Sequence, residues 1–236
     1  MQAIGPWVLT YALQVVIAGI FLWGIRYRDA KVATNAGGAL FVSLTPYLAQ
    51  WTYHTHVGWP VVFWTTTAGF LHTLGAKGLY SMIGWWDHVA HTISGGLVAM
   101  LISAIVVVAA GPPTASNDSM VGYGLVMSFV VGWGVFWELL ECISQRVSRW
   151  LDNSVMLTQD GARDGILDIS FNILGAGIVL LVPGSIFTPL VRHVPLVNAT
   201  FLHTLILVVI GLDLALGLVV ASARVWDRAV STANHD

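Results

Sequence analysis

Acidic and histidine residues are spaced for joint chemistry in three stretches of this sequence. The stretches are Asp87-x-x-x-His91, Glu138-x-x-Glu141 and Asp164-x-x-x-Asp168-x-x-x-Asn172. Residues three or four positions apart share one face of a helix, so each stretch predicts a helix with a polar, titratable face. Each of these stretches adjoins an apolar run. Titratable groups in such a run are costly unless they find partners.

These residue types favour a divalent cation. Carboxylate oxygens and an imidazole nitrogen bind Mg, Mn, Zn or Fe. Two buried glutamates one turn apart repel each other unless a cation or a basic partner joins them. We therefore expect four residues to act as metal ligands and catalytic groups, namely His91, Glu138, Glu141 and Asp168. Four more are expected around them or at the entrance of the site, namely Asp87, Asp164, Asn172 and Arg163.

Two other interpretations use the same residues. A hydrogen-bonded proton or ion relay also needs acids and histidines inside a membrane. An isolated Asp or Glu near a helix end often only caps the helix or extends to the membrane interface. Arg163 fits a phosphate or carboxylate contact, or a simple anchor at the membrane surface.

The composition places these residues in a membrane. Hydrophobic residues make up 56% of the chain and charged residues only 9%, and the mean hydropathy is +0.77. Ordinary soluble domains carry about 25% charged residues. The net charge of −2 gives no basic surface for nucleic acid, and the single cysteine, Cys142, excludes an intramolecular disulfide. The lipid bilayer is the expected partner.

Apolar runs predict an all-α bundle of about seven transmembrane helices in one domain, residues 1–236. A span needs roughly 20 apolar residues, and some of these runs are shorter. The predicted spans are Trp7–Gly24, Val32–Leu48, Val61–Leu74, Val89–Ala110, Val121–Ile143, Gly165–Leu181 and Phe201–Ala223. Prolines and polar residues predict loops at Gly111–Asp118 and Pro183–Ala199.

Charge gives the expected orientation. With seven spans, nine of the ten Lys and Arg residues fall on one side of the membrane, and only Arg192 falls on the other. Loops rich in Lys and Arg remain in the cytoplasm. We therefore expect an external amino terminus, a cytoplasmic carboxyl terminus and a multi-pass protein of the plasma membrane. All three polar stretches then lie toward the cytoplasm, where Gly95, Gly96 and Gly175 would let their helices approach closely.

The three stretches together resemble the YjdF-like integral membrane proteins, and more distantly the VanZ-like proteins. His72-Thr73-Leu74-Gly75-Ala76 and Thr158-Gln159-Asp160-Gly161 add to the YjdF-like pattern. VanZ-like proteins tend to carry a basic residue after the Asp and a Gln at the second Glu, whereas this chain has His88 and Glu141. The resemblance implies a multi-span bundle with a shared polar site, and it implies no reaction.

Two function classes remain for the polar site. The first is a metal-dependent membrane enzyme that acts on a lipid-borne substrate from the cytoplasmic side. The alternative is a proton- or ion-coupled transporter or channel, or a structural subunit of a membrane complex. Transporters often show internal repeats, and the absence of a visible repeat tilts the prediction to the enzyme. A retinal protein is excluded because the last predicted span has no lysine for a Schiff base.

Two further polar features stand apart. Asp213 lies in the middle of the last predicted span and should face a partner or a cavity. His54 and His56, after the second span, are spaced to share a metal from an extended segment, although an interfacial aromatic belt is the preferred interpretation.

Overall fold

The computed structural model describes residues 4–54, 57–110, 116–150, 162–181 and 186–192, with Thr204, Leu207 and Gly211. These residues form helices and no strand, which confirms the all-α prediction for the described part of the chain. The elements are α1 Ile4–Arg26, α2 Ala30–Tyr53, α3 Trp59–Leu74, the π-helix η1 Gly75–Leu79, α4 Tyr80–Met82, α5 Trp86–Ala110, α6 Ser116–Trp150, α7 Ala162–Leu180 and α8 Thr188–Val191.

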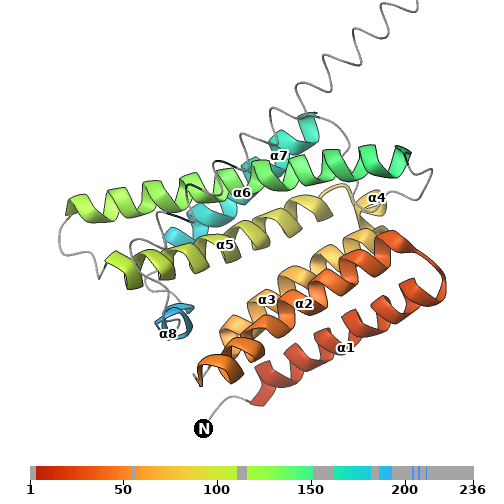
Figure 1. Cartoon of the computed structure of the whole chain (residues 1–236), viewed down its shortest axis with the longest axis horizontal. Helices are drawn as coiled ribbons and strands as arrows, with labels where there is room; N and C mark the ends of the chain where they lie inside the picture. Colours follow the sequence, from red (N-terminus) through yellow and green to blue (C-terminus); the bar gives the residue numbers. More distant parts are fainter. Residues whose placement is uncertain are drawn as a thin grey trace, which may run out of the picture.

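The long helices alternate in direction and form two groups (Figure 1). Helices α1, α2 and α3 pack against one another, and α5 packs against α7 and α6. Contacts between α3 and α5 join the two groups. The indoles of Trp64 and Trp86 strengthen this joint, since they donate to the carbonyls of Ile93 and Leu71 at 3.2 and 3.0 Å.

Six of the predicted spans coincide with helices, each of which begins before the first residue of the predicted apolar run. The predicted loop at Gly111–Asp118 is too long, because Ser116 already begins α6. Ser, Asn and Asp are residue types that are common at the start of a helix, so the sequence 116–118 is compatible with this earlier beginning. The predicted loop at Pro183–Ala199 contains the short helix α8. Of the seventh predicted span only three positions are described, and Asp213 lies outside them.

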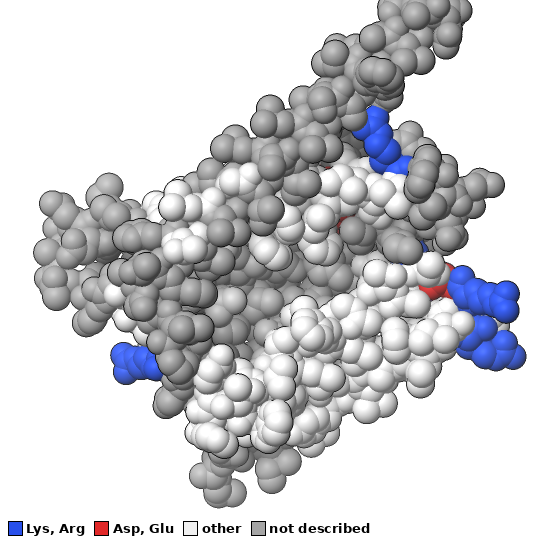
Figure 2. Space-filling model, viewed as in Figure 1, with Lys and Arg blue, Asp and Glu red and all other residues white. Residues whose placement is uncertain are grey.

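Three described helices are long and apolar enough to cross a membrane, namely Gly5–Arg26, Trp86–Ala109 and Gly122–Val147. Apolar side chains such as Val15 and Phe41 project outward and are 70% and 69% exposed. Figure 2 shows Lys and Arg gathered mostly at one end of the molecule, and the described surface in view between the two ends is largely uncharged. An apolar belt with charged ends is the surface that a bilayer requires.

Glycines allow α5 and α7 to cross in close contact. A Cβ on Gly95 would collide with the backbone of Asn172, and a Cβ on Gly175 would collide with the carbonyl of Thr92. Gly96 takes part in the same crossing, since a Cβ on Gly175 would lie only 2.9 Å from the Gly96 amide nitrogen. The close approach predicted for these three glycines is confirmed, and it brings the polar faces of the two helices together.

The chain folds back on itself between α3 and α5. Gly78 adopts a φ of 143°, a conformation that glycine alone enters readily. This turn lays the ring of Tyr80 over Gly75, where a Cβ would collide with it. The same end of the molecule holds Lys77, whose Nζ lies 3.0 Å from the centroid of the Trp23 ring at the end of α1.

Candidate metal centre

The first turns of α5 present Asp87 and His91 on one face, as their spacing predicts. His91 Nε2 lies 3.6 Å from Asp87 Oδ1. His91 is buried, and the Asp87 side chain keeps 28% of its surface exposed. Helix α5 therefore contributes one buried imidazole with a partly exposed carboxylate beside it.

Helix α7 brings a second carboxylate to the same imidazole. Asp168 Oδ2 lies 3.7 Å from His91 Nε2, and Asp168 is only 2% exposed. Its other oxygen, Oδ1, is buried and has no hydrogen-bond partner among the described groups. A buried carboxylate oxygen without a partner is costly, so this oxygen is placed to accept a proton or a cation.

Asp87, His91 and Asp168 form the tightest group of ligand-type atoms in the described part of the chain. One ligand atom from each lies within 4.8 Å of the other two. The separations of 3.6 and 3.7 Å from His91 Nε2 exceed a good hydrogen bond. Two atoms each about 2.1 Å from one tetrahedral ion lie about 3.4 Å apart, so these spacings fit a shared metal ion closely.

Asn172, one turn after Asp168, holds His91 in place. Its side chain hydrogen-bonds to the His91 imidazole and is almost fully buried. Room for the carboxamide comes from Gly134 on α6, where a Cβ would lie 3.3 Å from Asn172 Nδ2. A hydrogen bond to the ring nitrogen that does not face the carboxylates fixes the orientation of a histidine, which is the support that a metal-binding histidine needs.

Helix α6 carries its two glutamates to the edge of this cluster. Glu138 is 9% exposed and lies against Gly165 of α7, where a Cβ would collide with its carboxylate. Glu141 Oε1 accepts a hydrogen bond from Trp137 Nε1 at 2.9 Å. Both carboxylates lie close enough to interact with the charge of Asp168. The glutamates thus lie beside the group of three on its α6 side, and Asp87 takes the place within it that we expected a glutamate to fill.

The remaining predicted residues lie at the start of α7. Asp164 is partly buried and interacts electrostatically with Asp87 and Asp168. Arg163 is exposed. The predicted set therefore gathers at one end of the bundle from three helices, with Arg163 at its outer edge.

His72 of α3 is a member of this site that the spacing of the acids did not predict. Its Nδ1 lies 2.7 Å from the Tyr80 hydroxyl, and its Nε2 lies 3.0 Å from Ser94 Oγ. Burial, together with the nearby carboxylates of Asp87, Glu141 and Asp168, raises the pKa of Tyr80 well above its usual value. The phenol therefore stays protonated and can donate to Nδ1, which leaves Nε2 to donate to Ser94. The available signals were one histidine within an apolar run and the place of His72 in the YjdF-like stretch His72-Thr73-Leu74-Gly75-Ala76.

The fold and this cluster define a helical membrane protein that gathers acids and histidines at one end of its bundle. The chain belongs to the family of predicted membrane proteins designated DUF2238, whose model matches residues 8–188. This family is the one that the YjdF-like motifs indicated. The match extends from α1 to α8 and contains every residue of the cluster. No curated protein and no solved structure matches the chain.

Proposed function

We propose that this protein is a metal-dependent membrane enzyme whose divalent ion is held by Asp87, His91 and Asp168. The observation that carries the proposal is the convergence of their ligand atoms within 4.8 Å, with one Asp168 oxygen buried and without a hydrogen-bond partner. Two carboxylate oxygens and one imidazole nitrogen suit Mn, Fe or Zn, and the imidazole makes Mg less suitable.

The donor set leaves room for chemistry. Three protein ligands leave at least one position on the ion for water or substrate, as catalytic sites do and closed structural sites do not. A bound ion supplies Lewis acidity there. Glu138 and Glu141 border the cluster from α6, so either carboxylate is placed to accept a proton from a group bound at the open position.

The membrane arrangement in this proposal has seven spans, an external amino terminus and a plasma-membrane location. Its support is the alternation of the long helices and the concentration of basic residues at the end that holds the cluster (Figures 1 and 2). That end faces the cytoplasm by the positive-inside rule. Because the cluster lies within helices at the edge of the apolar belt, a substrate anchored in the lipid reaches it most directly.

Metal content tests the proposal. The full chain is purified in detergent without chelator, and bound Mn, Fe, Zn and Mg are measured by mass spectrometry of the elements. We expect stoichiometric metal in the natural protein and its loss in Asp168→Asn. Asp29→Asn is the matched control, because Asp29 caps α2 through Val32 N, is not one of the three ligand-type residues, and asparagine caps equally well. If the natural protein binds none of the four metals, even after reconstitution with each, the proposed metal centre is wrong.

A second experiment separates the enzyme from an ion-coupled transporter. The loaded protein is incubated with a total membrane lipid extract, and lipid composition is compared with a sample treated with chelator. An enzyme changes one lipid class only when metal is present. If instead the extract is unchanged and vesicles with the protein accumulate divalent cations across the bilayer, the transporter interpretation replaces the enzyme.

A further inference from the structure

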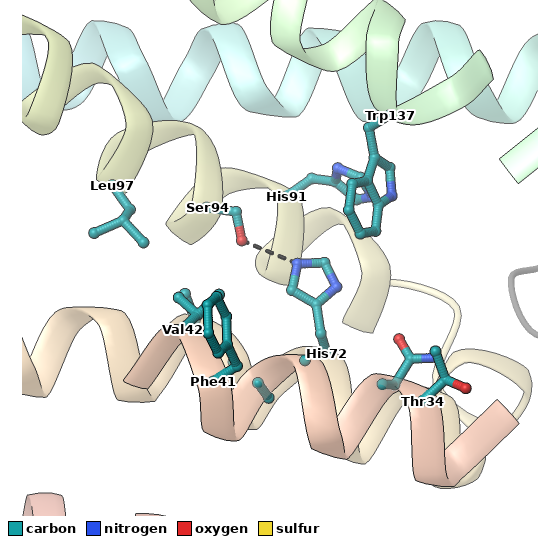
Figure 3. Close-up of a pocket in the computed structure, with 13 residues that line it drawn as sticks. Thr34, Phe41, Val42, His72, His91, Ser94, Leu97 and Trp137 are labelled. Carbon is teal, nitrogen blue, oxygen red and sulfur yellow. Dashed lines mark hydrogen bonds between the residues drawn. The ribbon is translucent and has the colours of Figure 1, made fainter. Parts of the chain in front are cut away.

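A cavity of about 410 Å³ lies between the two helix groups. Helices α2, α3 and α5 line it, and Trp137 of α6 contacts one part (Figure 3). Ligand pockets in proteins commonly have volumes of 300–1,000 Å³, so this cavity is large enough for a small molecule or one lipid chain. It reaches the candidate metal centre, since His91 belongs to its wall.

The wall of the cavity is divided into a polar and an apolar end. His72, His91 and Trp137 lie close together at one end, and the hydrogen bond from His72 to Ser94 crosses the gap between α3 and α5 (Figure 3). Figure 3 places Leu97, Phe41 and Val42 toward the other end. The polar end is the one near the membrane surface, because His91 lies only two turns from the start of α5. This polarity matches a lipid with its head at the surface and its chain directed inward.

The cavity has an opening through the outer face of α2. Phe41 and Val42 line the cavity, and they are also 69% and 42% exposed. Gly38, one turn earlier, lines it as well, and a Cβ there would meet no atom within 4 Å. A chain can therefore enter sideways from the bilayer, past a surface that has no large side chain at Gly38.

Among the described residues, no charged side chain lines the polar end. The described residues that line the cavity include no Lys, Arg, Asp or Glu. Both nitrogens of His72 are already paired, but Ser94 Oγ accepts from His72 and keeps its own O–H to donate to a hydroxyl or carbonyl oxygen. A phosphate or a free carboxylate would need a cationic partner, and no side chain of the described wall supplies one.

We infer that this cavity binds one hydrocarbon chain of an uncharged amphiphile, with its hydroxyl or ester head group at the Ser94 hydroxyl, beside His72. The inference deepens the proposed function, on which it rests for the role of the head group beside His91. Binding of the chain itself uses the apolar wall between α2, α3 and α5 and needs no metal ion.

A photoreactive monoacylglycerol with a diazirine in its chain is the probe for this site. The full protein is labelled in detergent or nanodiscs, and labelled peptides are located by mass spectrometry. We expect labels on the cavity faces of α2, α3 and α5, and competition by unlabelled monoacylglycerol that exceeds competition by oleate. Labels confined to outward faces, or competition by oleate of equal strength, would overturn the inference.

Two glycine variants form the matched pair. Gly38→Phe fills the opening, and we expect it to lower labelling about tenfold, equivalent to about 1.4 kcal/mol of binding free energy. Gly19→Phe adds the same side chain to an exposed position of α1 where a Cβ also meets nothing within 4 Å, and it should label like the natural protein. Equal labelling of both variants would contradict a site at this cavity.

A further pair of measurements keeps the two proposals separate. Asp168→Asn should lose the metal but keep the photolabelling. A result that contradicts the metal centre therefore does not contradict the lipid site, and a result that contradicts the lipid site does not contradict the metal centre. The competing occupant is the apolar segment 201–223 of the same chain. A rapid disulfide between Gly38→Cys and Leu207→Cys, in a chain with Cys142→Ala, together with absent labelling, would assign the cavity to that segment and overturn the lipid site.

Discussion

His72 and His91 meet edge to face, with ring centroids 5.8 Å apart and ring planes at 85°, although they come from α3 and α5. This contact joins two arrangements that would otherwise be separate. His91 is held by the carboxylates of Asp87 and Asp168, and His72 by Tyr80 and Ser94. Both rings line the cavity, so a molecule bound there lies beside His72 and beside His91 of the candidate metal centre at the same time.

The His72 arrangement should depend on the Tyr80 hydroxyl. Tyr80→Phe removes the partner of His72 Nδ1 and leaves a buried nitrogen unpaired, which costs about 1–3 kcal/mol of unfolding free energy. Thermal unfolding in detergent measures the loss. Tyr123→Phe is the control, because Tyr123 is 50% exposed and should change stability little. Equal unfolding temperatures for the two variants would show that the Tyr80 contact contributes nothing.

The raised pKa of Tyr80 predicts a loss of stability in alkali. Above the ordinary tyrosine pKa of about 10, the unfolded phenol ionises while the buried phenol keeps its proton. The folded state then binds more protons than the unfolded state, so stability falls as the pH rises, by up to about 1.4 kcal/mol per pH unit. Tyr80→Phe should flatten this part of the pH profile between pH 10 and 11, and an unchanged slope would contradict it.

The crossing of α5 and α7 should be sensitive to a single methyl group. Gly95→Ala places its Cβ against the backbone of Asn172, which cannot yield like a side chain, and overpacking of this kind costs about 1–3 kcal/mol or more. Gly177→Ala on α7 meets nothing within 4 Å and should stabilise its helix by up to about 1 kcal/mol. Unfolding temperatures that change in the same direction for both would contradict the close crossing.

Periodicity in the sequence predicted much of this arrangement, because helix faces depend on local spacing. The face shared by Asp87 and His91 follows from an interval of four residues. The convergence of α5, α6 and α7 was predicted from the side of the membrane on which the three stretches fall, and the tight crossing from the small residues beside them. None of these patterns fixes how far one helix is rotated or shifted against another. The place of Asp87 inside the group of three, with Glu138 and Glu141 beside it, depends on that relative position.

The hydrogen-bond partners of His72 could not be predicted from local patterns for a different reason. Tyr80 returns to His72 only because the chain reverses at Gly78 with a positive φ and passes over Gly75. A glycine signals that such a turn is allowed, but not which side chain the turn delivers or to which residue. The hydrogen-bond partners of His72 come from α4 and α5, and they are assembled by tertiary structure alone.

The membrane arrangement predicts opposite locations for two parts of the chain. Reporter proteins fused within Pro112–Asp118 and after Asp236 should report the external and cytoplasmic sides respectively, because basic residues gather in the loops on the cytoplasmic side. If both fusions report the same side, the count of seven spans is wrong. Activity of an enzyme reporter that folds only in the cytoplasm is the measurement.

Charge, rather than shape, should be what the acids contribute. Glu138→Gln and Asp168→Asn keep the volume of the side chain and remove its charge. We expect both variants to purify with unfolding temperatures near that of the natural protein, because fewer buried like charges then repel one another. Metal binding and any metal-dependent activity should fall sharply. Variants that retain both would show that the acids serve only structure.

Gly165 offers a way to disturb Glu138 without changing it. The three atoms nearest to a Cβ at position 165 all belong to the end of the Glu138 side chain, which can rotate away, whereas the Cβ at Gly95 meets backbone. Gly165→Ala should therefore leave stability within about 1 kcal/mol of the natural protein, since helix propensity offsets the displacement. If Glu138 supports the metal centre from α6, the same variant should weaken metal binding several-fold. Gly177→Ala, again on α7, should not affect metal binding. Unchanged metal affinity in Gly165→Ala, combined with a loss in Asp168→Asn, would restrict the centre to α5 and α7 and remove Glu138 from it.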